Sequence, residues 1–495
     1  MTALCVMVLG TSSGAGKSWL TTALCRHFAR QGLKVAPFKA QNMSNNARVV
    51  AGLPTAGGRA WGEIGSAQYF QALAARATPD VRMNPLLLKP EADTRSQVVL
   101  LGQAHPGLSA MPWRGRSEHV WPQIRQSLDE LRAEHDVVVI EGAGSPAEIN
   151  LHASDIVNMR VARHAQARCW LVTDIDRGGA FAHLYGTWAL LPPEERRLFR
   201  GFVLNKFRGD ASLLAPAPQM LQDLTGVPTV ATVPMQRDHG LPEEDGVFDD
   251  RTHTAGTVRL TVAVVAYPRI SNLDEFQALK NVPGVRLRWA RSPADVADAD
   301  WIVLPGSKHT SSDLAWLRAQ GLDQAVVAHA ERGGAVLGIC GGLQMLGEAL
   351  IDTEGVEAIA ASNAPGLGLL PLVTAFARDK TVQPTRARLS VQAGPWAALN
   401  GVEAGGYEIH HGQTALHPAM VAQGARAHPV LPGLGWHNAA GNVLGVYLHG
   451  LFEDPAVVRA LFGAAAPTLY AVFDRLADTL EAHTAPGALA QLVQP

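Results

Sequence analysis

Cysteine is scarce in this chain, with four among 495 residues, at widely scattered positions without the close spacing of a zinc site. Charged residues make up only 17%, and the net charge is −2, which argues against a protein that holds polyanions by general positive charge. We therefore expect no nucleic acid partner. No apolar run approaches the roughly 18 residues that a membrane span needs, so we expect no membrane partner either.

The chain begins MTALCVMVLG, which is apolar but lacks a basic flank and a cleavage site. We therefore expect a buried first strand rather than a signal peptide. Scattered cysteines of this kind are typical of reduced thiols, so the sequence predicts a cytoplasmic protein. Nothing in it indicates an oligomeric state.

Hydrophobic residues make up 47% of the chain, which suits globular folding. Short apolar runs alternate with helical patterns, as in α/β proteins with parallel sheets. Residues 235–257 lose this periodicity and are acidic, with Pro and Gly, so they are interpreted as a linker. We predict an α/β fold with two domains, at 1–234 and 258–495.

The first predicted strand, LCVMVLG, leads into GTSSGAGKS and then a helix over about residues 17–31. A strand, a glycine loop and a helix N-terminus together cradle phosphate oxygens; the lysine adds a point charge, and the serine hydroxyl binds Mg²⁺. Thr11 stands where the usual spacing has its first glycine, and Gly10 comes one residue earlier. This longer loop resembles that of dethiobiotin synthetases. The predicted nucleotide-binding residues here are Gly10, Thr11, Gly14, Gly16, Lys17 and Ser18.

A second candidate group follows two further strands of the same predicted sheet. Glu141 ends the apolar run DVVVIEG and is the predicted Mg²⁺ ligand together with Ser18, although a solvent-facing glutamate is the alternative. A polar run lies just past the strand that begins at residue 34, where parallel sheets place ligands. Its members Lys39, Gln41, Asn42 and Asn45 are predicted to bind the phosphoryl group and a carboxylate substrate, unless they only cap the next turn.

In the C-terminal half, the apolar strand AVLGIC ends on Cys340, followed by Gly341, Gly342 and a helical pattern, LQMLGEAL. A thiol on a strand-to-helix turn is held out of the sheet, with the next backbone N–H aimed at a developing oxyanion. A buried core cysteine is the alternative. The strand VLGVYL delivers a candidate base, His449; His410 and His411 compete with it.

These elements resemble class I glutamine amidotransferases. The resemblance implies that Cys340 is the nucleophile and His449 the base, and that Gly306 and Gly341 form the oxyanion hole. Many of these enzymes carry His-x-Glu, but the residue two after His449 is Leu451, and Glu453 is four along. The third member of the catalytic group is therefore left unassigned.

Together the halves indicate an ATP-dependent amidation that uses Mg²⁺ and takes ammonia from glutamine, with phosphorylation activating a carboxylate. The strings FKAQNMSNN, MNPLLLKP, DIVNM, DIDRGGAFA, LNKFRGD, GICGGLQMLG and GYEIHHG resemble the cobyric acid synthase family over nearly the whole chain. The resemblance implies amidation of carboxylates b, d, e and g of adenosylcobyrinic acid a,c-diamide, a corrinoid. Related synthetases place an Asn against adenine, which makes Asn205 a nucleotide candidate.

Two alternatives stay open. The first is another two-domain amidase-synthetase, such as cobyrinic acid a,c-diamide synthase. The second is a non-enzymatic P-loop ATPase with a degenerate amidotransferase tail; the presence of both Cys340 and His449 argues against it.

Overall fold

The computed structural model describes residues 2–55, 58–92, 94–237, 239–242, 257–357, 362–463 and 467–494. The chain forms two compact units. Unit 1 comprises Met1–Ser44, Val50–Leu241 and Thr468–Pro495, and unit 2 comprises Asn45–Val49 and Pro242–Pro467. The predicted two-domain α/β fold is confirmed. Most of the predicted linker, residues 243–256, lies outside the described residues.

Unit 1 is built on a six-stranded sheet of order β12-β11-β10-β1-β9-β2, and every neighbouring pair in it is parallel. Because all strands point the same way, their carboxyl ends share one edge, which is where parallel sheets bind ligands. The strands are β1 Leu4–Gly10, β2 Val35–Phe38, β9 Val137–Glu141, β10 Arg168–Asp174, β11 Phe199–Phe207 and β12 Thr229–Pro234.

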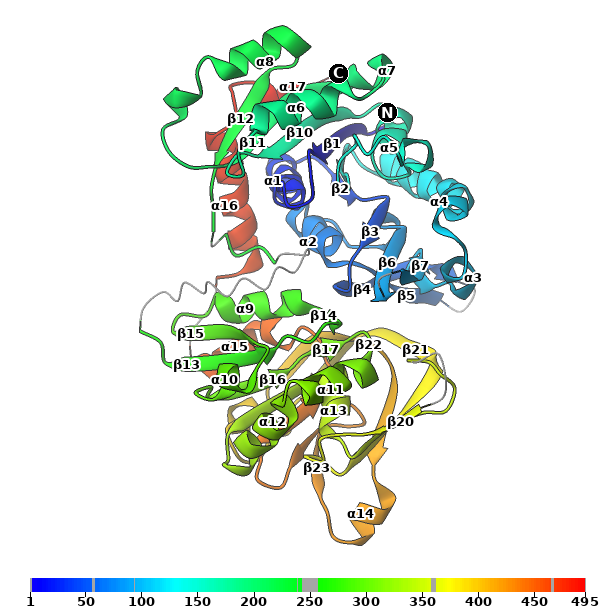
Figure 1. The fold of residues 1–495 in the computed structure, drawn as a ribbon, viewed down its shortest axis with the longest axis vertical. Coiled ribbons are helices and arrows are strands. Elements are labelled where there is room, and N and C mark those ends of the chain that lie inside the picture. Colours follow the sequence, from blue (N-terminus) through cyan, green and yellow to red (C-terminus); the bar gives the residue numbers. More distant parts are fainter. Residues whose placement is uncertain are drawn as a thin grey trace. The chain divides into compact units, whose positions relative to one another are not determined.

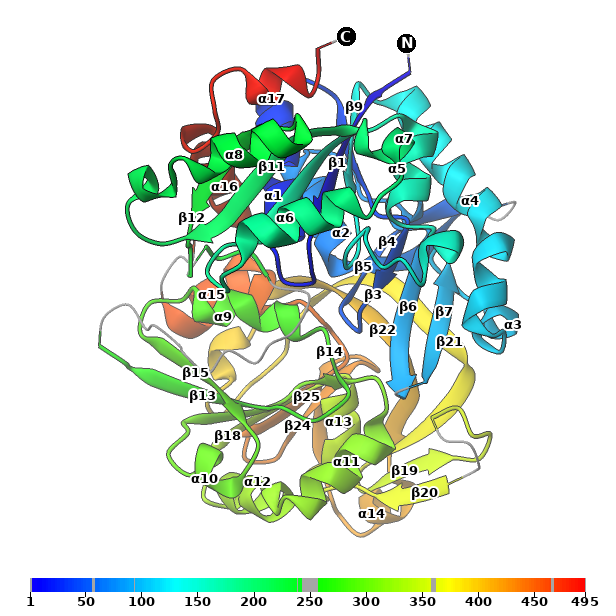
Figure 2. The ribbon, with the colours of Figure 1, turned by 45° about the horizontal axis from the view of Figure 1, so that its top comes forward.

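Helices cover both faces of this sheet (Figures 1 and 2). Successive strand residues point to opposite faces. In β1, Met7 and Leu9 join the apolar cluster with α4, α5, α6 and α8, whereas Val6 and Val8 join the cluster with α1, α2, α16 and α17. The helices of unit 1 are α1 Lys17–Arg30, α2 Ser66–Ala74, α3 Pro106–Ser109, α4 Trp113–Glu134, α5 Met159–Ala165, α6 Ala180–Ala189, α7 Pro193–Arg196, α8 Ala217–Thr225, α16 Leu469–Ala482 and α17 Ala488–Gln491.

The C-terminal residues belong to unit 1, which corrects the predicted extension of the second domain to residue 495. Helix α16 buries Phe473 and Leu476 in the core of unit 1. The buried Arg26 of α1 forms an ion pair with Asp474 of α16, with 2.8 Å between Nε and Oδ1. The long-range packing of α16 on α1 therefore decides where this helix belongs.

Smaller sheets lie beside the main sheet of unit 1. One has four strands in the order β3-β6-β7-β8, and another is the pair β4-β5. Strand β4 begins within the stretch Asn45–Val49, which belongs to unit 2, and continues into unit 1. Their bounds are β3 Gln41–Met43, β4 Ala47–Thr55, β5 Gly58–Gly65, β6 Leu86–Ala92, β7 Arg95–Leu100 and β8 Gln103–Ala104.

Unit 2 has a seven-stranded sheet of order β15-β13-β16-β18-β25-β24-β23. The first five strands pair in parallel, and β24 and β23 extend the sheet in antiparallel fashion. The strands are β13 Leu260–Val265, β15 Val285–Ala290, β16 Trp301–Leu304, β18 Ala335–Ile339, β23 Ala427–Leu431, β24 Gly435–Asn438 and β25 Val443–Val446. Its helices are α9 Gln277–Lys280, α10 Pro293–Val296, α11 Thr310–Ala319, α12 Leu322–Glu331, α13 Gly341–Leu346, α14 Pro418–Ala422 and α15 Pro455–Phe462.

A four-stranded sheet of order β20-β19-β21-β22 and a short pair, β14-β17, complete unit 2. The predicted helix LQMLGEAL is wrong in its second half, because α13 ends at Leu346 and β19 begins at Ala349. There the chain pairs with β20 and β21, and this pairing outweighs local helix propensity. The bounds are β14 Ile270–Ser271, β17 Gly306–Ser307, β19 Ala349–Asp352, β20 Ser362–Pro365, β21 Leu372–Arg388 and β22 Glu403–Leu416.

Within the described part of the chain, we find no helix that combines the length and the apolar character needed to cross a bilayer.

Candidate functional sites of the two units

The predicted phosphate loop connects β1 to α1, as the sequence indicates. Gly14 and Gly16 have φ angles of 72° and 102°, in the left-handed region that favours glycine. A Cβ atom on Gly16 would lie 2.0 Å from the side-chain nitrogen of Asn205, so a larger residue would collide there. The loop therefore turns its backbone into the start of α1, the geometry that exposes N–H groups to an anion.

Thr11 and Lys17 stand at the two ends of this loop. The Lys17 ammonium donates to the carbonyl oxygens of Ser12 at 3.0 Å and Gly144 at 3.1 Å, which places it at the carboxyl edge of the sheet. Thr11 donates its hydroxyl to Thr173 at the end of β10, at 3.0 Å. The unusual threonine thus ties the start of the loop to the neighbouring strand.

Glu141 is 1% exposed and lies at the centre of a polar cluster at the end of β9. Its carboxylate accepts hydrogen bonds from Ser18 at 2.9 Å, Lys39 at 2.9 Å and Gln71 at 2.5 Å. Burial opposes ionisation of Glu141, but the Lys39 ammonium and these hydrogen bonds outweigh it and lower the pKa of Glu141 below its ordinary value. The solvent-facing alternative for Glu141 is therefore wrong, and an ionised carboxylate stands beside the loop serine.

The polar run after β2 is divided between the two units. Lys39, Gln41 and Asn42 belong to unit 1, whereas Asn45 belongs to unit 2. Asn42 is buried and donates to the side chain of Gln68 in α2 at 3.1 Å. The structure therefore brings Lys39 to the Glu141 cluster and anchors Asn42 on α2, but it does not group Asn45 with them.

Asn205 contacts the phosphate loop directly. Its side-chain nitrogen donates to the carbonyl oxygen of Ala15 at 2.9 Å. The next residue, Lys206, donates to the carbonyl oxygen of Gly14 at 2.8 Å and pairs with Asp174 at 3.1 Å. Both side chains at the end of β11 therefore hold the loop in place, in addition to any contact of Asn205 with a base.

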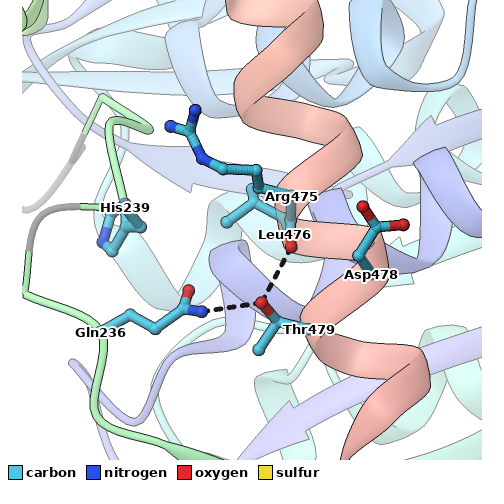
Figure 3. Close-up of a pocket in the computed structure, with 6 residues that line it drawn as sticks. All are labelled: Gln236, His239, Arg475, Leu476, Asp478 and Thr479. Atoms are coloured by element: carbon cyan, nitrogen blue, oxygen red, sulfur yellow. Dashed lines mark hydrogen bonds between the residues drawn. The ribbon is translucent and has the colours of Figure 1, made fainter.

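A surface pocket of about 410 Å³ lies beside α16 in unit 1 (Figure 3). The Gln236 amide donates to the Thr479 hydroxyl at 2.8 Å and so joins the chain after β12 to α16. His239 and Arg475 also border the pocket, as do Leu476 and Asp478. None of the residues predicted to bind nucleotide or substrate lines it.

In unit 2, Cys340 occupies the sharp turn between β18 and α13. Its φ and ψ angles of 50° and −106° are unusual for a residue with a side chain. Such strain persists only where the surroundings impose it, and it is common at reactive residues. The closeness of the neighbouring strand β16 explains Gly342, because a Cβ there would lie 1.8 Å from the carbonyl oxygen of Leu304. The turn has the geometry of a nucleophile elbow.

The Cys340 thiol donates to the carbonyl oxygen of Ile409 at 3.7 Å, and it lies close enough to His449 for its charge to act on the imidazole. Nδ1 of His449 lies 3.1 Å from Oε1 of Glu275, whose second oxygen accepts the N–H of Gly450 at 2.8 Å. Burial disfavours a charged imidazole, but the negative charges of Glu275 and Cys340 outweigh it and raise the pKa of His449 to about 10. The three side chains form a Cys–His–Glu arrangement.

Sequence reasoning did not find Glu275. It lies in a short 3₁₀ turn, Leu273–Phe276, far from the cysteine and the histidine along the chain. The candidate four residues after the histidine, Glu453, instead pairs with Arg48, 2.5 Å from its guanidinium. No local pattern around NLDEF distinguishes Glu275 from an ordinary acidic turn residue.

The competing histidines have other partners. Nδ1 of His410 lies 2.8 Å from the carbonyl oxygen of Gly412, and its Nε2 lies 3.2 Å from Glu408. His411 contacts the carbonyl oxygen of Ala377 through Nδ1 at 3.1 Å. Of the three histidines, His449 is the one that the structure joins to Cys340.

The two predicted oxyanion glycines border the thiol and its base. Gly341 follows Cys340 directly at the start of α13. A Cβ on Gly306 would lie 2.8 Å from Cε1 of His449 and 2.6 Å from Oγ of Ser271, so the backbone approaches the imidazole as closely as glycine permits. Both backbones are therefore near the place where glutamine would react.

Two family models match the chain. A CobQ/CobB/MinD/ParA nucleotide binding domain covers residues 6–246, and a CobB/CobQ-like glutamine amidotransferase domain covers residues 261–457. These matches fall on the phosphate loop and on the Cys–His–Glu arrangement, respectively.

Curated relatives match along the full length. The cobyric acid synthase of Acidovorax ebreus is 75% identical over 494 residues, covering 99% of each chain. That of Variovorax paradoxus is 74% identical over 494 residues, covering 100% of each chain, and that of Leptothrix cholodnii is 65% identical over 503 residues, covering 99% of this chain and 97% of the relative. With the phosphate loop in one unit and a thiol, imidazole and carboxylate in the other, this protein belongs to the cobyric acid synthase family.

Proposed function

We propose that the chain uses ATP and glutamine to amidate carboxylates b, d, e and g of adenosylcobyrinic acid a,c-diamide in cobalamin biosynthesis. The observation that carries this proposal is the presence of two complete sets of reactive groups in one chain. One is the Glu141 cluster beside the phosphate loop, and the other is the Cys340–His449–Glu275 arrangement. Family membership supports the choice of substrate.

In unit 2, His449 accepts the thiol proton and Cys340 attacks the side-chain carbonyl carbon of glutamine. The N–H groups of Gly341 and Gly306 are proposed to stabilise the resulting oxyanion. The imidazolium then returns its proton to the departing amine, and ammonia leaves as the thioester forms. Water, deprotonated by His449, hydrolyses the thioester to glutamate. Glu275 accepts the N–H of Nδ1, which orients the ring, and its negative charge favours the charged form of the ring.

In unit 1, the loop N–H groups and Lys17 are proposed to hold the phosphates of ATP. Ser18 and Glu141 supply a hydroxyl and an ionised carboxylate 2.9 Å apart, which are hard oxygen ligands of the kind that Mg²⁺ prefers. When bound there, Mg²⁺ would neutralise charge on the phosphates. Lys39 stands beside the same carboxylate, where its charge can stabilise the phosphoryl group during transfer.

The reaction in unit 1 activates a carboxylate. A substrate carboxylate attacks the γ-phosphorus, ADP leaves, and an acyl phosphate forms. Ammonia then adds to the acyl carbon, and phosphate departs to leave the amide. Gln41 and Asn42 have donors and acceptors suited to carboxylates and carboxamides, and we assign them to substrate binding together with Asn45.

Mass spectrometry of the corrinoid product tests this function. The purified full-length protein is incubated with adenosylcobyrinic acid a,c-diamide, Mg-ATP and glutamine that carries heavy nitrogen in its side-chain amide. We expect a product with four labelled amides in place of four carboxylates. A chain that amidates cobyrinic acid at positions a and c, and leaves the a,c-diamide unchanged, would instead be the sister synthetase.

A further inference from the structure

Arg48 is a charged side chain that is only 1% exposed, and it lies in a short stretch of unit 2, Asn45–Val49, that is flanked along the chain by residues of unit 1. The five residues Asn45–Val49 are anchored there by reciprocal hydrogen bonds. The N–H of Ala47 donates to the side chain of Asn272 at 2.9 Å, and the N–H of Leu273 donates to the side chain of Asn46 at 2.9 Å. Asn272 and Leu273 are the cap and the first residue of the turn that carries Glu275.

The guanidinium of Arg48 contacts three side chains around the glutaminase group. It lies 2.5 Å from Asp274 and 2.5 Å from Glu453, and it donates to the hydroxyl of Tyr407. Asp274 is the immediate neighbour of Glu275 on the 3₁₀ turn. Arg48 therefore fixes the turn from which Glu275 reaches His449.

Tyr407 provides a second connection from Arg48 to the imidazole. Its ring is stacked on that of His449, with centroids 5.3 Å apart and an angle of 19° between the planes. The two residues also exchange backbone hydrogen bonds, at 3.2 and 2.9 Å. Arg48 thus holds the hydroxyl end of the ring against which His449 rests.

The charges explain why a cation is needed at this place. The carboxyl groups of Asp274 and Glu275 are buried, and that of the partly exposed Glu453 lies at the same guanidinium, so like charges repel there. Burial raises the pKa of Asp274 and brings that of Glu453 to about 7, and Arg48 counters both shifts. Arg48 thereby offsets part of the repulsion between these carboxyl groups, which would otherwise push Glu275 away from the imidazole.

We propose that Arg48 is a positioning residue for glutamine hydrolysis, which holds Glu275 and Tyr407 in place against His449. Arg48 follows the predicted substrate residues Gln41, Asn42 and Asn45 along the chain. The glutaminase is therefore complete only when the segment Asn45–Val49 is in its place in unit 2. The inference deepens the proposed function and rests on its assignment of His449.

The test compares full-length Arg48→Ala, Arg48→Lys and Tyr407→Phe with the unchanged protein. We expect Arg48→Ala to lower the kcat of glutamine hydrolysis roughly 10²-fold, since a small misplacement of a reacting group has such an effect, with a much smaller change in the KM for glutamine. Arg48→Lys should retain more activity, because it keeps the charge but not the three-way geometry. Added guanidinium should restore part of the kcat of Arg48→Ala.

Ammonia-dependent amidation serves as the internal control, because it does not need the thiol. It should be unchanged in all three variants. Arg288→Ala is the matched control, since Arg288 pairs with Asp298 in the same unit without contacting the Cys–His–Glu arrangement, and it should leave glutamine hydrolysis unchanged.

A glutaminase kcat for Arg48→Ala within about threefold of the unchanged protein would overturn the proposal. If Arg48→Ala also loses ammonia-dependent amidation, Tyr407→Phe decides, because it removes a single hydroxyl: a several-fold lower kcat supports the proposal and an unchanged one refutes it. A Cys340→Ser variant that still hydrolyses glutamine would instead refute the proposed function.

Discussion

The carboxylate of Glu275 lies 3.1 Å from Nδ1 of His449, although 174 positions separate the two residues along the chain. Both side chains are almost completely buried, at 0% and 1% exposed. In this environment a carboxylate has a large effect on the protonation of its neighbour, because little water screens the charge. The pH dependence of glutamine hydrolysis should therefore report on this contact.

Replacing Glu275 with Gln should shift the alkaline limit of glutamine hydrolysis to lower pH. The Glu275 carboxylate helps to raise the pKa of His449 to about 10, so the imidazolium persists in alkaline solution. Without that charge the pKa of His449 falls, and the imidazolium that protonates the leaving amine is lost earlier as the pH rises. The measurement is the pH profile of kcat/KM for glutamine. An alkaline limb that does not move in Glu275→Gln would contradict the assignment.

Lys17→Ala and Glu141→Gln should lower amidation with glutamine and with ammonia alike, because either nitrogen source needs the acyl phosphate. We expect losses on the order of 10²–10³-fold, typical of removing one electrostatic group at a reacting centre. Glu141→Gln should also raise the Mg²⁺ concentration that half-maximal activity requires. Both effects are measured as corrinoid amide formed per unit time.

The control for these two variants is Lys34→Ala, which changes an exposed lysine of the same unit. It should behave as the unchanged protein does. Full ammonia-dependent activity in Lys17→Ala would show that this loop does not bind the ATP that drives amidation.

Asn42→Ala should raise the KM for the corrinoid more than it lowers kcat, if Asn42 reads the substrate. The opposing explanation is that Asn42 is structural, because its side chain donates a hydrogen bond to Gln68 of α2. Gln68→Ala removes the same hydrogen bond and is therefore the matched comparison. A lower melting temperature in both variants, with an unchanged KM for the corrinoid, would show that Asn42 only supports α2. Asn45→Ala, which changes a residue of unit 2, should likewise raise the KM for the corrinoid more than it lowers kcat. Glutamine hydrolysis should be unchanged in this variant.

Local sequence was sufficient for the features that lie within one strand, loop and helix. The phosphate loop before Lys17 and the elbow at Cys340 each depend on glycines beside an apolar run, and the structure contains both. The pattern carries this information because sharp turns need glycine and buried parallel strands need continuous apolar residues.

Long-range contacts were not accessible in the same way. Glu275, Gln71 and Arg48 acquire their significance from partners far along the chain, and each stands in an unremarkable local context. Helix α16 joins unit 1 because its apolar side and Asp474 match α1, which is a property of two distant segments together. The helix predicted after Cys340 is wrong in its second half for the same reason, because the chain there pairs with the distant strand β21.

The most direct test of the whole account is the activity of Cys340→Ser with each of the two nitrogen sources. Serine at this position removes the thiolate that attacks glutamine and leaves the groups of unit 1 unchanged. The account predicts that glutamine-dependent amidation of the corrinoid falls on the order of 10⁴-fold or more, as when a nucleophile is removed, while ammonia-dependent amidation proceeds at the rate of the unchanged protein. A variant that still uses glutamine at nearly the full rate, or that loses amidation with ammonia as well, would contradict the division of chemistry between the two units.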